Sequence, residues 1–179
     1  MFARKILVLD MEMTGLKVHI HSALSLGICL LDETLEIIDS EYFLIQPKVP
    51  LIYTKRALSI NKFKKDELSN HPPISQVVQQ FHARFVQKYE QVPLLAGWNV
   101  NHDIDFLKDL YDLGNIVYPF SHRVLDVQSV SCFLNQGEDV TFHKELLKYG
   151  REVTHNALND AQDTVFLLKE YSKILNKMG

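Results

Sequence analysis

Two carboxylates, Asp10 and Glu12, follow a short apolar run at residues 6–9. Four consecutive apolar residues, two of them β-branched, predict a strand that is buried on both faces. Because side chains alternate along a strand, both carboxylates project to the same side of it. Two acids this close repel each other unless water solvates them or a hard cation such as Mg²⁺ lies between them. The pair alone fits either an ordinary solvated strand end or a metal site, so the rest of the chain must decide.

Two further acids lie near the starts of predicted helices. Asp103 falls in the first turn of a helix whose apolar residues recur at helical spacing, and the helix dipole favours a negative charge there. It shares a face with Leu107, whereas Asp105 points elsewhere and is expected to be solvated. Asp160 lies in the first turns of a long C-terminal helix that begins near residue 158. His155 precedes this acid by five residues, in a loop or at the helix cap.

These five residues predict a site for metal-dependent chemistry on a phosphodiester. Connections of the strand–helix–strand type would gather the four acids on one edge of a sheet. Clustered carboxylates without counter-ions repel each other, and a pair of divalent cations about 4 Å apart removes that cost. Such a pair clamps the attacking and leaving oxygens of a phosphodiester. A histidine, with an ordinary pKa of about 6.5, takes the proton from the attacking water near neutral pH.

The composition is typical of one globular domain, here residues 1–179, with 46% hydrophobic and 23% charged residues. The formal net charge is -3, and two divalent cations would change it to -3 + 4 = +1. This balance leaves a short nucleic acid open as a partner and argues against extended binding along a duplex. No apolar run approaches the roughly 20 residues of a membrane span, and no signal peptide precedes the first strand. Both cysteines lie among apolar residues, so we expect reduced thiols, a cytoplasmic location and no membrane partner.

The remaining elements predict an α/β fold. Apolar runs at 23–31 and 35–46 follow the first strand after short connections, which indicates an antiparallel meander. Further strands are expected at 92–98 and 124–126, each after a helical segment. Helices are expected after Pro72-Pro73, around Asp103, after Asp126, at 141–149 and at the C-terminus.

Several local features carry specific expectations. Asn101 is the expected N-cap of the helix that carries Asp103, and Gly114 is its expected end. Asp126 is expected to cap the helix that follows it. The segment 47–70 is expected to be a solvated loop with one or two short helices. A second interpretation stays open for this segment, in which its lysines and Phe63 line a path for a backbone and a base.

Three motifs resemble those of the DnaQ-like, or DEDDh, 3′–5′ exonucleases. They are Asp10-x-Glu12-x-Thr14-Gly15, Asn99-x-x-x-Asp103-x-x-x-Leu107 and His155-x-Ala157-Leu158-x-Asp160-Ala161-x-x-Thr164. They occur in the family's order, and the resemblance covers nearly the whole chain. It implies a ribonuclease-H-like fold, with a five-stranded mixed sheet of order 3-2-1-4-5 flanked by helices. It also implies two divalent cations, Mg²⁺ or Mn²⁺, and single-stranded DNA or RNA 3′ ends as partners, with release of 5′-mononucleotides.

The resemblance also implies roles for individual residues. Asp10 would bridge both cations, Glu12 and Asp160 would hold the nucleophile-side cation, and Asp103 would support the second. His155 would be the general base. Substrate contacts are expected from Thr14, Gly15, Leu16, Phe63, Asn99 and Phe106, of which Leu16, Phe63 and Phe106 would form apolar walls.

Some positions depart from the family pattern, and other interpretations stay open. His102 stands where the family commonly has Phe and Met13 where it commonly has Thr, so the preferred substrate is in doubt. Asn156 occupies the position of the sister branch's Tyr, which favours the histidine branch. No polymerase-binding tail is evident after the last helix, and the chain is expected to be a monomer or homodimer. The alternatives are a catalytically degenerate binding domain and another metal-dependent phosphodiesterase or phosphatase of the same fold.

Overall fold

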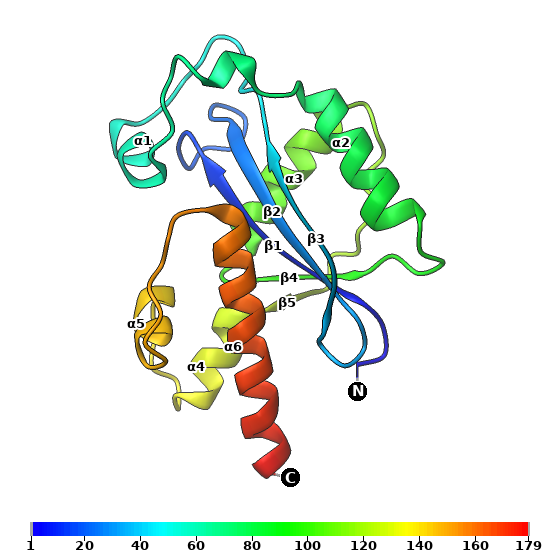
Figure 1. The fold of residues 1–179 in the computed structure, drawn as a ribbon, viewed down its shortest axis with the longest axis vertical. Helices are drawn as coiled ribbons and strands as arrows, with labels where there is room; N and C mark the ends of the chain where they lie inside the picture. The colour runs from blue at the N-terminus through cyan, green and yellow to red at the C-terminus, as the bar shows by residue number, and fades with distance from the viewer. Residues whose placement is uncertain (1, 179) are drawn as a thin grey trace.

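The computed structural model describes residues 2–178, and its centre is a five-stranded mixed sheet (Figure 1). The strand order is β3-β2-β1-β4-β5, as predicted. Strand β1 pairs antiparallel with β2 and parallel with β4, while β2–β3 is antiparallel and β4–β5 is parallel. The strands are β1 (Ile6–Met13), β2 (Ala23–Leu31), β3 (Ile37–Leu44), β4 (Leu94–Gly97) and β5 (Val124–Asp126).

Helices cover both faces of this sheet, which makes a three-layer α/β/α domain (Figure 1). One layer contains α2 (Ile74–His82), its π-helical continuation η2 (Ala83–Gln87) and α3 (Asn101–Leu113). The other contains α4 (Val127–Leu134), α5 (Phe142–Leu147) and α6 (Ala157–Met178). Two short helices, α1 (Lys55–Asn61) and the 3-10 turn η1 (Leu68–Asn70), interrupt the segment after β3, as predicted.

Alternation along β1 decides which layer each of its residues meets. Leu7 and Leu9 belong to the core beneath α2 and α3, whereas Ile6 and Val8 belong to the core beneath α6. All four are fully buried, as the continuous apolar run predicts. The even-numbered side chains of β1 therefore face the α6 layer.

The helix caps agree with the predictions at two of three positions. The Asp126 carboxylate accepts the Gln128 N–H (3.3 Å) and caps α4, and Gly114 ends α3. The prediction for Asn101 is wrong, because this residue is already helical and Val100 precedes the helix without a side-chain cap. No helix within residues 2–178 is both long and apolar enough to cross a membrane.

Candidate active site

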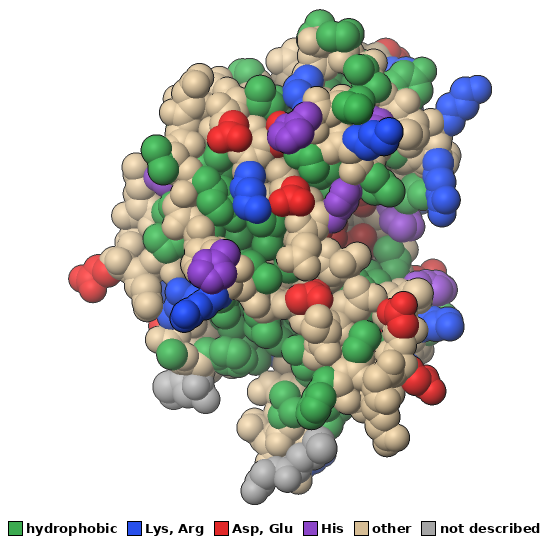
Figure 2. Space-filling model, turned by 180° about the vertical axis from the view of Figure 1, so that it is seen from behind, with side chains coloured by type: hydrophobic (Ala, Val, Ile, Leu, Met, Phe, Trp, Pro, Cys, Tyr) green, Lys and Arg blue, Asp and Glu red, His purple; other side chains and the backbone are tan. Residues whose placement is uncertain are grey.

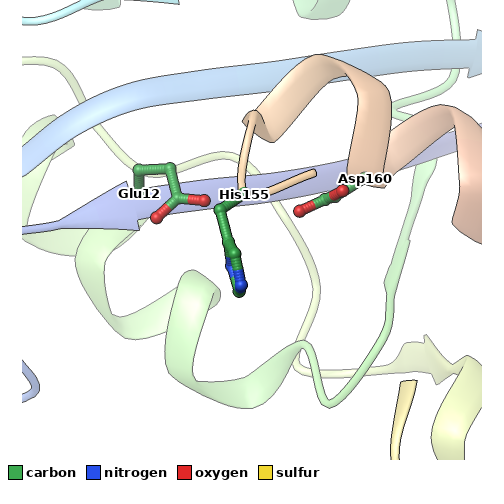
Figure 3. A group of neighbouring side chains, drawn as sticks. All are labelled: Glu12, His155 and Asp160. Atoms are coloured by element: carbon green, nitrogen blue, oxygen red, sulfur yellow. The ribbon is translucent and has the colours of Figure 1, made fainter. Parts of the chain in front are cut away.

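The end of β1 brings Asp10 and Glu12 to the start of α6. Both residues lie on the even-numbered face of β1, which faces the α6 layer. Figure 3 shows the carboxylates of Glu12 and Asp160 on either side of His155, whose ring points downward between them. Ligand atoms of Glu12, His155 and Asp160 all lie within 4.8 Å of one another. Residues separated by about 150 positions in the sequence therefore form one compact cluster, as the motifs predicted.

A glycine allows α6 to approach the sheet this closely. Gly27 of β2 pairs with Asp10 in the sheet, and the first turn of α6 lies directly over it. A Cβ at Gly27 would lie only 2.1 Å from the carbonyl carbon and oxygen of Ala157. The sequence analysis did not identify Gly27, although an isolated glycine inside an apolar strand often marks a close backbone approach.

The loop before α6 fixes the positions of His155 and Asp160. Asn156 caps the helix, since its side-chain oxygen accepts the Asn159 N–H (3.2 Å). His155 has a φ of 55°, a left-handed conformation that turns the chain just before the cap. One carboxylate oxygen of Asp160 accepts the Thr154 N–H (3.1 Å) and hydroxyl (3.0 Å). The capping role that remained open for His155 thus belongs to its neighbour Asn156. The exposed ring of His155 instead lines a cleft beside Glu12 and Asp160.

Asp103 reaches the same site from the opposite helical layer. It lies in the first turn of α3 and is 8% exposed. Its Oδ1 accepts the backbone N–H of Met11 (3.0 Å), the residue between the two carboxylates of β1. Asp105, two residues later, is exposed and pairs with Lys108 (3.1 Å), as expected of a solvated acid.

Burial disfavours the ionised form of all four acids, and repulsion by the other acids adds to it at Asp10 and Glu12. Burial, followed by the charges of Asp103, Asp160 and Glu12, raises the pKa of Asp10 well above its usual range. Burial and the charges of Asp160 and Asp103 raise the pKa of Glu12 to about 8. Burial also raises the pKa of Asp103 to about 7. Burial raises the pKa of Asp160 as well, although the hydrogen bonds from Thr154 lower it in part. Such a cluster needs positive charge to be fully ionised at neutral pH.

The donor set fits hard divalent cations. Carboxylate oxygens are the ligands preferred by Mg²⁺ and Mn²⁺, and nearby cations lower the pKa of buried carboxyl groups. Glu12, Asp160 and His155 form the compact cluster of Figure 3, and Asp10 lines the same cleft. These residues would hold divalent cations here.

Three of the four acids, Asp10, Glu12 and Asp160, line a cleft of about 540 Å³ between β1 and α5. Its wall opposite β1 contains Thr141, Phe142 and His143, at the start of α5. Sequence analysis did not connect this segment with the site. Nothing in its local pattern reveals that α5 lies beside β1, because the placement follows from packing against α6.

A second pocket, of about 580 Å³, shares Glu12 with the cleft and extends toward α1. Gly15 and Leu16 line it, and Leu16 is 74% exposed. Their contacts with a nucleotide remain a prediction. Its apolar lining also includes Ala57 and Ile60 of α1. The pocket and the cleft therefore meet at Glu12.

Thr14 has a structural role that differs from the expected substrate contact. It is fully buried, and its hydroxyl donates to the Ile52 carbonyl (2.7 Å) and accepts the Ser22 N–H (2.9 Å). Its backbone N–H donates to the Ser22 carbonyl (2.8 Å), and its carbonyl accepts the Thr54 N–H (2.7 Å). Thr14 thus fastens the loop after β1 to the segment before α1, and neither its hydroxyl nor its backbone reaches the surface.

Two predicted aromatic walls lie away from the pocket. Phe106 is fully buried in the core beneath α3, so it does not form a wall for a nucleotide. Phe63 is half-buried and packs edge-to-face on His71 (5.8 Å between ring centroids), outside the residues that line the cleft and the second pocket. Asn99 is exposed at the turn before α3, and its N–H donates to the Asp126 carboxylate (2.9 Å). A substrate contact from Asn99 remains a prediction.

Solved structures with this fold include several nucleases. The chain is 16% identical to the nuclease domain of 3′hExo, a DEDDh family member bound to rAMP, covering 95% of this chain and 92% of that one (TM-score 0.78). It is 17% identical to E. coli exonuclease I in a zinc-bound complex with single-stranded DNA, covering 93% and 40% (TM-score 0.74). It is 13% identical to exonuclease I from Methylocaldum szegediense, covering 94% and 41% (TM-score 0.78). The chain thus spans about two fifths of the exonuclease I chains.

The sequence itself identifies the family. No curated protein matches the chain significantly. The family model RNase_T, described as Exonuclease, matches residues 7–168 and so includes all four acids and His155. This chain therefore belongs to the exonuclease family of the DnaQ-like, ribonuclease-H-like nucleases and is a nucleic acid exonuclease.

Proposed function

We propose that this exonuclease removes 5′-mononucleotides from the 3′ end of single-stranded DNA or RNA, using two divalent cations and His155 as the general base. The main support for this proposal is the cluster of Glu12, His155 and Asp160. Asp10 on β1 and Asp103 from the opposite layer complete it. E. coli exonuclease I has been solved with single-stranded oligonucleotides, which supports the choice of a single strand.

The two cavities that share Glu12 suggest how a chain end binds. The scissile phosphate would lie against the acids, and the terminal nucleoside would occupy the pocket beside Leu16, Ala57 and Ile60. Bases stack on apolar side chains regardless of sequence, so this pocket would accept any base. A duplex end would have to fray before its last nucleotide could enter.

The residues of the chain divide the remaining work. Bound Mg²⁺ or Mn²⁺ would supply Lewis-acid stabilisation of negative charge on the phosphate. Asp10, Glu12 and Asp160 would hold one cation, and Asp10 with Asp103 would hold the second. His155 is exposed to the cleft, lies beside Glu12 and Asp160, and would accept the proton of the attacking water. Asn156 and the Thr154 bonds to Asp160 would keep these groups in position.

Matched DNA and RNA oligomers with a 5′ label test this proposal. We expect a ladder of shortened 5′-labelled fragments with Mg²⁺ or Mn²⁺ and no cleavage with a chelator. A circular single strand is the control, because it has no end and should remain intact. Rapid cutting of the circle would indicate an endonuclease, a 5′-mononucleotide as the first labelled product would indicate the opposite polarity, and binding without any cleavage would indicate a degenerate domain.

A further inference from the structure

The two walls of the site carry opposite charge. The α1 wall, residues 53–67, contains five Lys or Arg and two acids, a formal charge of +5 - 2 = +3. The α5 wall, residues 138–152, has the same length and contains three Lys or Arg and four acids, a charge of +3 - 4 = -1. Figure 2 shows Lys and Arg side chains gathered over α1 at the upper right, above a hollow in which acidic side chains are visible. The asymmetry is local, since the whole chain carries -3.

The cations of the α1 wall are also more available than those of the α5 wall. Within residues 2–178, Lys55, Arg56 and Lys62 are exposed and have no carboxylate within 4.0 Å. On the α5 wall, Lys148 pairs with Glu145 (2.7 Å) and Arg151 with Asp163, and both of these acids are buried. Among the described residues of the α5 wall, Lys144 is the one exposed cation without an ion pair. A cation that is already paired with a carboxylate attracts a phosphate less strongly, so most of the unpaired positive charge lies on the α1 side.

Hydrogen bonds fix the α1 wall to the catalytic strand. The Thr54 N–H donates to the Thr14 carbonyl (2.7 Å), and the Asn61 side chain donates to the Met13 carbonyl (3.0 Å). The two ends of α1 are therefore tied to consecutive residues at the end of β1. Lys65 extends the wall and lies over the Tyr53 ring, 3.9 Å from its centroid. The basic surface thus has a fixed position beside Glu12.

We propose that the α1 wall binds the phosphates of a single-stranded substrate upstream of its terminal nucleotide. This inference rests on the proposed function, since it requires a strand whose 3′ end lies among the acids. The strand would cross α1 rather than α5, because α1 presents three exposed, unpaired cations on a wall of charge +3, whereas the described residues of the α5 wall present one, Lys144, among four acids. Contacts to phosphates carry no sequence information, so the surface would increase affinity for longer strands without selecting bases.

The test compares two substrates and two triple variants. One substrate is a single-stranded 12-mer, and the other is the p-nitrophenyl ester of thymidine 5′-monophosphate, which has no upstream phosphate. Lys55→Gln/Lys62→Gln/Lys65→Gln removes three charges from the α1 wall. Lys169→Gln/Lys173→Gln/Lys177→Gln removes three charges from α6 and is the control for total charge.

We expect kcat/KM for the 12-mer to fall about tenfold or more in the α1 variant at low salt, with a salt dependence shallower by about 2 log units per log unit of salt. Hydrolysis of the ester should change less than about twofold, and the α6 variant should match the wild type on both substrates. An unchanged 12-mer rate, an equal loss on the ester, or an equal loss in the α6 variant would each overturn the proposal. If the wild type cleaves neither substrate, the proposed function itself fails.

Discussion

The backbone of Gly27 in β2 lies in direct contact with the backbone of Ala157 at the start of α6. A Cβ on residue 27 would be 2.1 Å from the Ala157 carbonyl. This distance is a severe clash, and only a movement of the backbone could relieve it. The same turn of α6 carries Asp160 and follows His155, while Gly27 pairs with Asp10 on the neighbouring strand. The spacing between the two halves of the active site therefore depends on the absence of a side chain at Gly27.

Gly27→Ala tests this dependence. We expect the start of α6 to move away from the sheet, with a loss of about 1–3 kcal/mol in the free energy of unfolding and a fall in kcat of about tenfold or more. Urea unfolding and steady-state rates on a labelled single strand measure the two effects. Gly150→Ala is the control, because a Cβ at Gly150 meets no atom within 4 Å, although its φ of +69° makes it prone to a small stability loss. A Gly27→Ala enzyme with normal kcat would show that the contact is unimportant for the site.

Asp10→Asn should separate stability from activity. Removing one charge from the cluster relieves repulsion and desolvation, so the free energy of unfolding in chelator should rise by about 1 kcal/mol or more. Cleavage should fall by more than about a hundredfold, because the proposed ligand of both cations is lost. Asp105→Asn removes the same charge at an exposed position paired with Lys108 and should leave the rate unchanged. Retained activity in folded Asp10→Asn would refute the assigned role.

The stability of the metal-free protein should decrease as pH rises. The folded-state pKa values of Glu12 (about 8) and Asp103 (about 7) exceed their ordinary values near 4, so the folded state binds more protons than the unfolded state between these limits. The stabilisation from these two groups is therefore fully present below about pH 4 and is lost as the pH rises to about 8. The loss in the free energy of unfolding is on the order of a few kcal/mol. Thermal melts in chelator from pH 5 to 8.5 measure it.

Added Mg²⁺ should reverse this trend. Cations bind the ionised carboxylates, so the increase in melting temperature on adding Mg²⁺ should grow with pH. In Asp10→Asn the increase should be smaller at every pH. A melting temperature in chelator that rises steadily from pH 5 to 8.5 would contradict the raised pKa values.

His155→Asn should remove the proposed general base with little effect on the fold. Asn tolerates the φ of 55° at this position, and the helix cap belongs to Asn156. We expect kcat to fall about 10²–10⁴-fold with little change in melting temperature. Single-turnover rates across pH measure this loss.

Asn156→Ala provides the contrast. It should cost about 0.5–2 kcal/mol of stability through the lost cap while lowering kcat far less than His155→Asn does. If His155→Asn instead lost stability and kept its rate, the base would have to be another group, and His143 in the same cleft would be the first candidate.

The sequence alone determined the sheet and the residues of the candidate site. Continuous apolar runs specify buried strands, and helical spacing specifies faces, so β2 and β5 have the bounds that the pattern predicted. The order 3-2-1-4-5 and the convergence of Asp10, Glu12, Asp103, His155 and Asp160 came from three motifs in the family's order. These features are readable because each depends on local periodicity or on residues whose chemistry limits substitution.

Only the tertiary structure decided which neighbours complete the site. The position of Phe106 in the helical pattern fits a core residue as well as a pocket wall. In the structure it packs in the core beneath α3. Thr14 has a polar side chain whose partners, Ser22 and Ile52, cannot be identified before the loop is folded. Gly27 and His143 reach the site through contacts between segments far apart in sequence. Pairwise contacts of this kind leave no periodic signal in the chain, because they are fixed when α6 packs onto β2.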